Sequence, residues 1–435
     1  MNDSTAAPLP TGLNARLSFM MFLQYAIWGA WLPILYPFLT GHRAFTLEQF
    51  GWIMSGSAVG AIIGPFLAGQ IADRYFNTEK FLGISHLIGA GLVYKLSTTT
   101  EFKTFLALSV VYGLVYAPTL ALTNSLSFAH LPDRDRDFGR VRLWGTIGWI
   151  AAGIAVGQWL LLKHTPVDVT AKAIEAAQDA GRADAFRLSA LLGVFMGLYC
   201  FTLPNTPPSE GAKEQSATAE ALGEIRRQPL LTLFLIAVPV SCIHQFYFVY
   251  TSQFLSGYGQ DAANTINKIF GVGGGGLMTI GQMSELLVLA IIPFLAKSLS
   301  RKSLLAIGLL AYGVRMALFA YTDSLATVLL GVALYGLCFG CFIFVAFMVV
   351  DEETTPDVRA TAQNLFNLVI IGVGIILGSW IATWVGAWAT PENEAMDYTK
   401  LFSVPMYASL ACLAILLAFY PSRSPRRGDL PSAAS

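Results

Sequence analysis

Residues 276–297 read GLMTIGQMSELLVLAIIPFLAK, an apolar stretch with one carboxylate, Glu285, near its centre. An acid at the centre of a membrane helix costs roughly 2.5–3.5 kcal/mol on insertion scales, so it normally faces a cavity, a partner or a substrate path. Gln282 lies three residues earlier and therefore on the same helical face. An amide and a carboxylate side by side can hold a polar, hydroxyl-rich solute, and the acid can also carry a proton. The stretch predicts a membrane helix that lines a polar site.

The composition of the whole chain agrees with a membrane setting. Of its 435 residues, 55% are hydrophobic and only 12% are charged, and the mean hydropathy is +0.58. Soluble domains carry about twice that charged fraction. The apolar runs are continuous rather than alternating in polarity, and each is near the roughly 20 residues that a helix needs to cross a bilayer. We therefore predict an all-α polytopic membrane protein.

Twelve apolar runs can be placed, six on each side of a polar segment rich in Pro, Ser, Glu and Ala. This outline is typical of a transporter with two parallel six-helix halves. The predicted domains are an N-terminal six-helix bundle (1–203), a cytoplasmic linker (204–229) and a C-terminal six-helix bundle (230–435). The predicted spans are 17–39, 48–72, 79–97, 102–126, 141–163, 185–203, 230–256, 276–298, 302–321, 325–350, 359–389 and 400–420.

Positive charges in the connecting segments indicate the orientation. Lys and Arg are more frequent in the flanks on the side of the N-terminus, for example at Arg134, Arg136 and Arg140, than in the opposite flanks. By the positive-inside rule both termini are predicted to be cytoplasmic. No small-residue cleavage site follows the first apolar run, so that run is a retained helix rather than a signal peptide. These features fit a multi-pass protein of a bacterial inner membrane.

Three loops on the predicted outer side are longer than the others, at about 164–184, 257–275 and 389–399. The first is expected to contain a short amphipathic helix. The glycine-rich segment Gly271–Gly276 is expected to be a flexible lead into the eighth span.

Several functions are disfavoured by what the sequence lacks. The net charge is zero, which gives no indication of nucleic-acid binding. We find no P-loop and no Ser/His/Asp grouping, so neither ATP-driven pumping nor an enzyme is expected, and no cofactor is implied. The cysteines all fall in apolar runs and read as small hydrophobic residues, with no metal site predicted. They are Cys200, Cys242, Cys338, Cys341 and Cys412.

The start of the fifth span carries Arg142, Thr146 and Trp149 at i, i+4 and i+7, which is one stripe of a helix. A guanidinium, a hydroxyl and an indole on one stripe suit a ribose or a base. The alternative is an arginine that snorkels to the cytoplasmic interface.

The first span carries a similar stripe at Gln24, Trp28 and Trp31. The alternative for this stripe is helix packing with an aromatic belt. Gln24 lies too deep for the belt and needs a hydrogen-bond partner.

Three further spans carry polar or aromatic side chains. The seventh contains His244 and Gln245, and the tenth places Tyr335 and Phe339 at i and i+4. These residues either line the path or pack as aromatic core. Arg315 in the ninth span has no acid near it in the sequence, so its partner must come from another helix or from backbone carbonyls, and a structural role is favoured.

The second span ends with Gly69-Gln-Ile-Ala-Asp73-Arg74. This G-x-x-x-D-R pattern after a second span resembles the loop motif of the major facilitator superfamily. Its acid and base can latch neighbouring helices, and that latch must break when the two halves rock.

With these residues in place, the chain resembles the nucleoside:proton symporters of the major facilitator superfamily over residues 17–420. The sharpest matching pair is RLWGTIG with QMSE. The matching stretches are Phe22–Trp31 (FLQYAIWGAW), Tyr116–Asn124 (YAPTLALTN), Arg142–Gly148 (RLWGTIG), Gln282–Glu285 (QMSE), Arg315–Tyr321 (RMALFAY), Tyr335–Gly336 and Arg359–Gln363 (RATAQ).

The resemblance implies import of nucleosides with protons, by a monomer in the lipid bilayer. Glu285 would bind sugar hydroxyls or take part in proton coupling. Gln24 and Trp28 of the first span are added to the candidate site from their own stripe. The residues that the resemblance places at the nucleoside site are Arg142, Thr146, Trp149, Gln245, Gln282, Glu285, Tyr335 and Phe339.

Two departures from the family pattern bear on function. Gly340 stands where family members can carry an acid, which puts proton coupling in question, and Phe248 stands where they can carry an amide. A sugar, glycoside or modified-nucleoside carrier, with or without proton coupling, is therefore the alternative function. A non-transporting membrane sensor on the same fold is a more remote alternative.

Overall fold

The computed structural model describes residues 9–75, 77–132, 134–167, 169–207, 217–258, 265–273, 275–355, 359–391 and 395–421. Within these ranges, the side chains of residues 60, 61, 64–75, 134–136, 217–219, 293, 359 and 360 are not described. The predicted latch of Gly69, Asp73 and Arg74 therefore lies outside the described side chains, although its backbone continues the second long helix.

The described residues form helices and connecting segments, without a strand. The helices before the linker are α1 (Thr11–Trp31), α2 (Leu35–Pro37), α3 (Leu47–Tyr75), α4 (Thr78–Thr98), α5 (Phe102–His130), α6 (Arg134–Lys163), α7 (Ala171–Gly181) and α8 (Ala183–Cys200). The linker and the second half contain α9 (Ala217–Ile225), α10 (Leu230–Tyr258), α11 (Thr265–Phe270), α12 (Gly275–Ser298), α13 (Arg301–Tyr321), α14 (Leu325–Ala333), α15 (Tyr335–Leu337), α16 (Val345–Glu353), α17 (Arg359–Asn367), α18 (Gly374–Trp388) and α19 (Tyr398–Phe419). A 3-10 turn at η1 (Leu32–Ile34) and π-helical segments at η2 (Phe38–His42), η3 (Cys338–Phe344) and η4 (Leu368–Val373) connect several of them.

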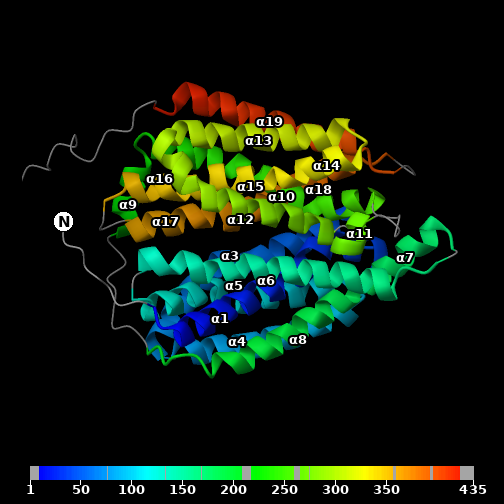
Figure 1. Cartoon of the computed structure of the whole chain (residues 1–435), viewed down its shortest axis with the longest axis horizontal. Helices are drawn as coiled ribbons and strands as arrows, with labels where there is room; N and C mark the ends of the chain where they lie inside the picture. Colours follow the sequence, from blue (N-terminus) through cyan, green and yellow to red (C-terminus); the bar gives the residue numbers. More distant parts are fainter. Residues whose placement is uncertain are drawn as a thin grey trace, which may run out of the picture.

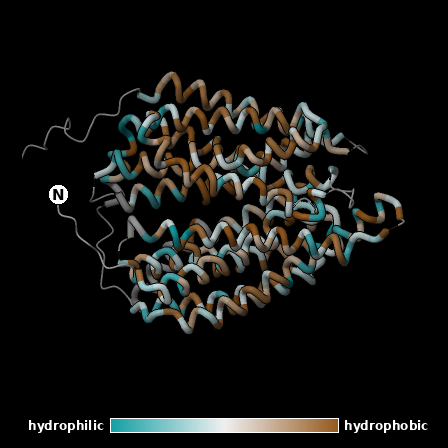
Figure 2. The backbone as a smooth tube through the Cα atoms, viewed as in Figure 1, coloured by the Kyte–Doolittle hydropathy of each residue, from teal (hydrophilic) through white to brown (hydrophobic). Residues whose placement is uncertain are grey.

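Ten segments among the described residues are long and apolar enough to cross a membrane. Helices α3 and α4, with 29 and 21 residues, also have the length for a span. Figure 2 shows apolar residues along the middle of the long helices and more hydrophilic residues toward their ends. Large apolar side chains are exposed on the outer surfaces, including Trp384 at 77% and Phe294 at 69%. The predicted all-α membrane fold is confirmed.

The two halves of the chain form two bundles that lie against each other (Figure 1). Helices α1–α8 make one bundle and α10–α19 make the other. Helix α9 of the linker packs against the second bundle, where Glu224 accepts hydrogen bonds from the backbone and the hydroxyl of Thr355 at 3.0 and 2.8 Å. Helix α9 lies at one end of the molecule, called here the linker end, and α7 and α11 lie at the other, called the α7 end.

Close helix packing within the bundles depends on glycine. A Cβ atom at Gly148 of α6 would lie 2.1 Å from the carbonyl oxygen of Phe22 in α1. One at Gly336 of α15 would lie 2.4 Å from the hydroxyl of Ser284 in α12. Small residues at such crossings are how membrane helices approach each other closely. The second crossing holds α12, and with it Glu285, against the tenth span.

The two bundles contact each other at the α7 end. The backbone N–H of Val272 donates to the carbonyl of Gly157 at 3.0 Å, and the Gln158 amide donates to the carbonyls of Lys268 and Ile269 at 2.7 and 2.9 Å. Gly271 has φ of 79° and packs so closely that a Cβ would lie 1.9 Å from the backbone of Gly157. The expectation of a flexible lead was wrong for this part of Gly271–Gly276, since Gly271 is fixed against α6. The expected short helix in the first outer loop is present as α7.

Replacing Gly148 by Ala should lower the free energy of unfolding by about 1–3 kcal/mol, because the new methyl group forces α1 and α6 apart. Gly139→Ala in the same helix is the matched control, since nothing lies within 4 Å of a Cβ there. It should be neutral or stabilise slightly. Thermal unfolding of both variants in the same detergent measures the difference, and equal melting temperatures would contradict this packing.

Candidate substrate site between the two halves

The predicted pair on α12 is buried, and one of its acceptors has no partner among the described residues. Gln282 is 4% exposed and Glu285 is 8% exposed. The side-chain oxygen of Gln282 has no hydrogen-bond partner in the part of the chain that the structure describes. A buried acceptor left unpaired is unfavourable unless a bound molecule supplies the donor. The face of α12 that carries Gln282 and Glu285 is therefore suited to a ligand with hydroxyl or N–H donors.

Arg142 brings a positive charge to this acid from the other half. It lies on α6, and its guanidinium interacts electrostatically with Glu285 of α12. The guanidinium carbon also lies 4.0 Å from the centroid of the Tyr25 ring in α1. The side chain thus turns into the protein, toward the interface between the halves, rather than only toward the membrane surface as the snorkelling alternative required.

A series of aromatic rings crosses the interface beside this charge pair. Trp28 of α1 meets Trp149 of α6 edge to face at 5.8 Å, and Trp149 meets Phe248 of α10 at 6.2 Å. Phe248 then meets Tyr335 at 6.4 Å, and Tyr335 stacks with Phe339 at 6.3 Å. Neighbouring rings of this kind attract each other in edge-to-face or offset geometry. Trp28 and Trp149 of the first half are thus joined through Phe248 to Tyr335 and Phe339 of the tenth span, whereas Trp31 packs against Tyr112 and Phe186 inside the first bundle.

Two other predicted residues lie nearby with their own environments. The Gln245 amide of α10 is buried and donates to the hydroxyl of Ser379 in α18 at 3.2 Å. Thr146 is half-buried on α6, between Arg142 and Trp149. The amide of Gln245 is thus partly committed to α18.

Gln24 has the partners that its depth required, and they lie inside the first half. Its Nε2 donates to the hydroxyl of Thr119 at 2.8 Å, and its Oε1 lies 2.8 Å from Nε2 of His86. Its backbone carbonyl accepts a hydrogen bond from the hydroxyl of Tyr116 at 2.6 Å. The side chain of Gln24 is therefore engaged within the bundle, whereas Trp28 on the next turn of α1 contacts Trp149, the ring that meets Phe248 of the other half.

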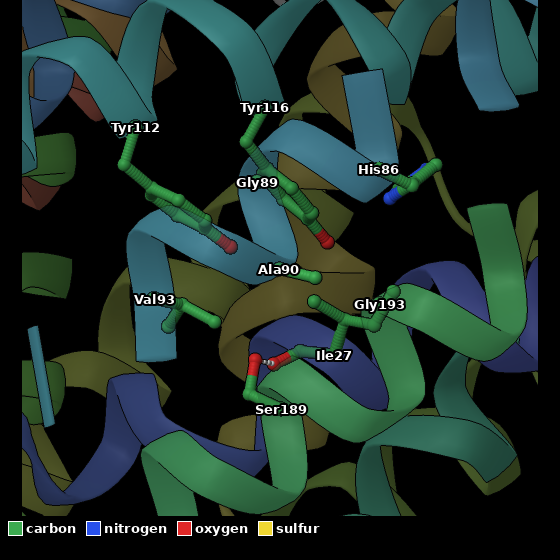
Figure 3. A pocket seen from close by; sticks show the side chains of 9 residues that line it. All are labelled: Ile27, His86, Gly89, Ala90, Val93, Tyr112, Tyr116, Ser189 and Gly193. Carbon is green, nitrogen blue, oxygen red and sulfur yellow. Dashed lines mark hydrogen bonds between the residues drawn. The ribbon is translucent and has the colours of Figure 1, made fainter. Parts of the chain in front are cut away.

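Sequence reasoning did not select His86, although a histidine in the apolar run 79–97 carries the same signal as an acid in a membrane helix. Figure 3 shows a small cavity beside His86 and the stacked rings of Tyr112 and Tyr116, which lie 5.2 Å apart. The cavity lies within the first bundle and has no room for a water molecule. It is therefore too small for a solute and is distinct from the interface described above.

Gly340, where the family pattern allows an acid, faces α12. A Cβ atom there would lie 2.6 Å from a methyl group of Val288. A larger side chain at this position would require the side chain of Val288 to shift. The glycine therefore belongs to the packing that holds α12, and the acid on this face of the site is Glu285.

The cysteines do not form a metal site. All five are free and buried. Among the residues that were described, no group of three or more His, Cys, Asp or Glu side chains is placed to hold a metal ion.

Two bundles of long membrane helices, with buried polar and aromatic side chains between them, are the architecture of a secondary transporter of the major facilitator type. The particular family follows from residues 11–424, which match the family described as nucleoside H+ symporter. The chain belongs to this family, and the resemblance seen in its sequence motifs is confirmed.

Individual relatives agree with this assignment. The chain is 35% identical to YegT of Escherichia coli (strain K12), named as a candidate nucleoside transporter, over 84% of this chain and 82% of YegT. It is 29% identical to the xanthosine permease of the same organism, covering 84% of this chain and 85% of the permease. A crystal structure of the nucleoside transporter NupG is similar with a TM-score of 0.78 at 25% identity, over 94% of this chain and 99% of NupG.

Replacing each of the two buried glutamines by leucine should change the stability of the ligand-free protein to different extents. Gln24→Leu leaves the Nε2 of buried His86 without its partner, which should lower the free energy of unfolding by about 1–3 kcal/mol, while Thr119 keeps its hydrogen bond to the carbonyl of Tyr116. Gln282→Leu removes an oxygen that is already unpaired, so the ligand-free protein should keep its stability. Thermal unfolding without ligand measures both. A larger loss for Gln282→Leu than for Gln24→Leu would contradict the assignment of these two roles.

Proposed function

We propose that this protein imports nucleosides together with protons by alternating access, with Glu285 as the coupling acid. The observation that carries the proposal is the buried pair of Gln282 and Glu285: the side-chain oxygen of Gln282 is unpaired among the described residues, and Glu285 interacts with the charge of Arg142 from the opposite half. The proposed substrate-binding residues are Arg142, Thr146, Trp149, Gln245, Gln282, Glu285, Tyr335, Phe339, Trp28 and Gln24. Of these, Gln24 is hydrogen-bonded within the first bundle, one helical turn before Trp28.

The chemistry of a nucleoside fits these groups. The ribose hydroxyls are donors, and the oxygens of Gln282 and Glu285 can accept from them. A base is a flat ring, and the aromatic series that includes Trp149 and Tyr335 offers faces and edges against which it can stack. Arg142 can donate to a base carbonyl or to a ribose oxygen. The site thus recognises a sugar and a base with different side chains.

Proton coupling follows from the placement of the two charges on different halves. When the halves rock, Arg142 moves relative to Glu285. A buried acid far from a cation favours its neutral form, and an approaching cation favours the ionised form. Glu285 would therefore take up a proton when Arg142 is distant and release it when Arg142 comes close.

Positive charges at the start of α6, such as Arg134, Arg136 and Arg140, support an assignment of sides by the positive-inside rule. We place the α7 end outside, where the Gly157 and Gly271 contact forms the outer gate, and the linker end with both termini in the cytoplasm. The halves 1–203 and 230–435 would rock as units in a bacterial inner membrane, with the protein acting as a monomer. Asp73 and Arg74 would latch the cytoplasmic end.

Cells without their own nucleoside carriers should accumulate labelled uridine or adenosine when they produce this protein. A protonophore should abolish accumulation, because the proton gradient supplies the driving force. Glu285→Gln should lose accumulation by at least tenfold and keep exchange of internal for external nucleoside, since a neutral amide cannot release a proton. Full accumulation by Glu285→Gln would exclude the coupling role.

The same assay separates the alternatives. Uptake that only equilibrates would indicate an uncoupled facilitator and would point to Gly340 as the reason. If no nucleoside is taken up, uptake of labelled sugars and glycosides is measured next. Uptake of one of these would make a sugar or glycoside the substrate.

Trp149→Ala should weaken nucleoside binding by about tenfold, because a lost stacking surface is worth on the order of 1–3 kcal/mol per base. Trp144→Ala is the matched control in the same helix, since Trp144 is 44% exposed on the outer surface of the bundle. The apparent affinity in uptake competition measures both. Equal effects of the two substitutions would show that Trp149 does not contact the base.

A further inference from the structure

A groove between the two halves lies on the outer surface of the protein and shares no residue with the proposed substrate site. Its volume is about 440 Å³, which is within the range of small-molecule sites. It is at the α7 end, because a Cβ atom at Gly41, shortly before α3, would touch Asp179 of α7. The residues that line it are Leu47 and Glu48 at the start of α3, and Trp380, Ile381, Thr383, Trp384 and Ala387 of α18.

The groove opens toward the surrounding membrane. Trp384 is 77% exposed, and Ile381 and Ala387 of the same helix are exposed as well. They belong to a segment that is long and apolar enough to cross a bilayer, Thr361–Trp388. Apolar surface of this kind favours contact with a hydrocarbon chain, and tryptophans near the end of a span lie at the level of the lipid headgroups. The groove is therefore suited to a lipid molecule.

Behind the groove, α3 and α18 are in close contact. Thr383 is 5% exposed, and a Cβ atom at Gly51 of α3 would lie 3.0 Å from its hydroxyl oxygen. The Trp380 ring meets the Trp52 ring of α3 edge to face at 4.8 Å. Because α3 and α18 belong to different halves, the groove keeps this shape only while the halves hold the arrangement seen here.

Glu48 is the one charged residue among the described residues that line the groove. It is exposed in the first turn of α3, and it forms no ion pair within the described ranges. The end of the helix is capped without it, because Thr46 and Gln49 exchange backbone-to-side-chain hydrogen bonds at 3.0 and 3.2 Å. The carboxylate of Glu48 is therefore free to meet a cation beside the groove.

We propose that this groove binds one phosphatidylethanolamine molecule, whose primary ammonium group pairs with Glu48 and whose acyl chain lies against Trp380 and Trp384. A primary ammonium brings both a positive charge and N–H donors to the carboxylate, which makes a charge-assisted hydrogen bond. An anionic headgroup such as phosphatidylglycerol brings like charge to Glu48 instead.

The bound lipid also regulates transport, and this part of the inference rests on the proposed function. The lipid contacts α3 of one half and α18 of the other. It therefore favours the arrangement in which these helices lie together over one in which they have parted, because a ligand shifts an equilibrium toward the state that binds it better. The rate at which the halves rock then depends on the headgroup.

Lipid retention by the purified full-length protein tests the binding. Phosphatidylethanolamine, phosphatidylcholine and phosphatidylglycerol with the same acyl chains are added in equal amounts in detergent, and native mass spectrometry counts the molecules that stay bound. Phosphatidylethanolamine should be retained at least threefold over the other two, because the ammonium of phosphatidylcholine has no N–H donor. Glu48→Gln should remove this preference, and Glu48→Asp, which keeps the charge, should preserve most of it.

Matched variants separate the charge from the groove. Asp323→Asn removes an exposed acid between α13 and α14, outside the groove, and should keep the preference. Ala387→Phe fills the groove and should lower retention of phosphatidylethanolamine at least threefold with Glu48 intact. Ala411→Phe places the same ring at an exposed position of α19 and should leave retention unchanged.

Nucleoside exchange in liposomes tests the regulation. Replacing phosphatidylethanolamine by phosphatidylcholine should change the exchange rate at least threefold in the unsubstituted protein and in Ala411→Phe, but not in Ala387→Phe. An exchange rate that does not depend on the headgroup would overturn the regulatory role.

Equal retention of the three lipids by the unsubstituted protein would overturn the binding site. A preference that persists in both Glu48→Gln and Ala387→Phe would also overturn it, in favour of general contact with the bilayer. The proposed function fails in a different way, when phosphatidylethanolamine is retained selectively and no nucleoside is exchanged in any of the lipids.

Discussion

A polar group buried in a membrane helix bundle needs a partner, and the two halves of this transporter meet that constraint differently. In the first half, Gln24 is satisfied by His86, Thr119 and Tyr116 within the bundle. In the second half, Gln282 keeps an acceptor unpaired. The first network fixes the helices that carry the aromatic stripe, and the second leaves capacity for a solute. The asymmetry is what allows one fold to combine a rigid frame with a binding face.

Much of this arrangement could be predicted from the sequence. The apolar runs gave the spans because their length is set by the bilayer, and the three-residue spacing of Gln282 and Glu285 placed both on one helical face. Contacts between distant helices could not be predicted in the same way. His86 lies 62 residues from Gln24, and the rotation of each helix that brings them together is decided by packing across the bundle. The same holds for Phe248, whose ring joins Trp149 of the first half to Tyr335 of the second only when both halves are assembled.

The tenth span shows how local backbone geometry adjusts this assembly. Segment η3 has π-helical hydrogen bonding directly after Tyr335, and Phe339 lies within it. A π-helical turn changes the register of the side chains that follow it, and such turns often occur at functional sites. Here Tyr335 and Phe339 remain stacked, with an interplanar angle of 15°, while Gly340 stays against Val288. One face of the span therefore meets the substrate interface and another holds α12 in place.

The glycine contact between Gly157 and Gly271 has a consequence for the speed of transport. The two backbones meet at glycines, so no side chain of these two residues interlocks with the opposite surface and has to withdraw when the halves separate. The hydrogen bonds of the Gln158 amide at this contact are exposed, so water can replace them. A smooth, lightly bonded seam of this kind can seal against solute leakage and still separate with a low activation barrier. The contact at the α7 end is thus suited to frequent opening.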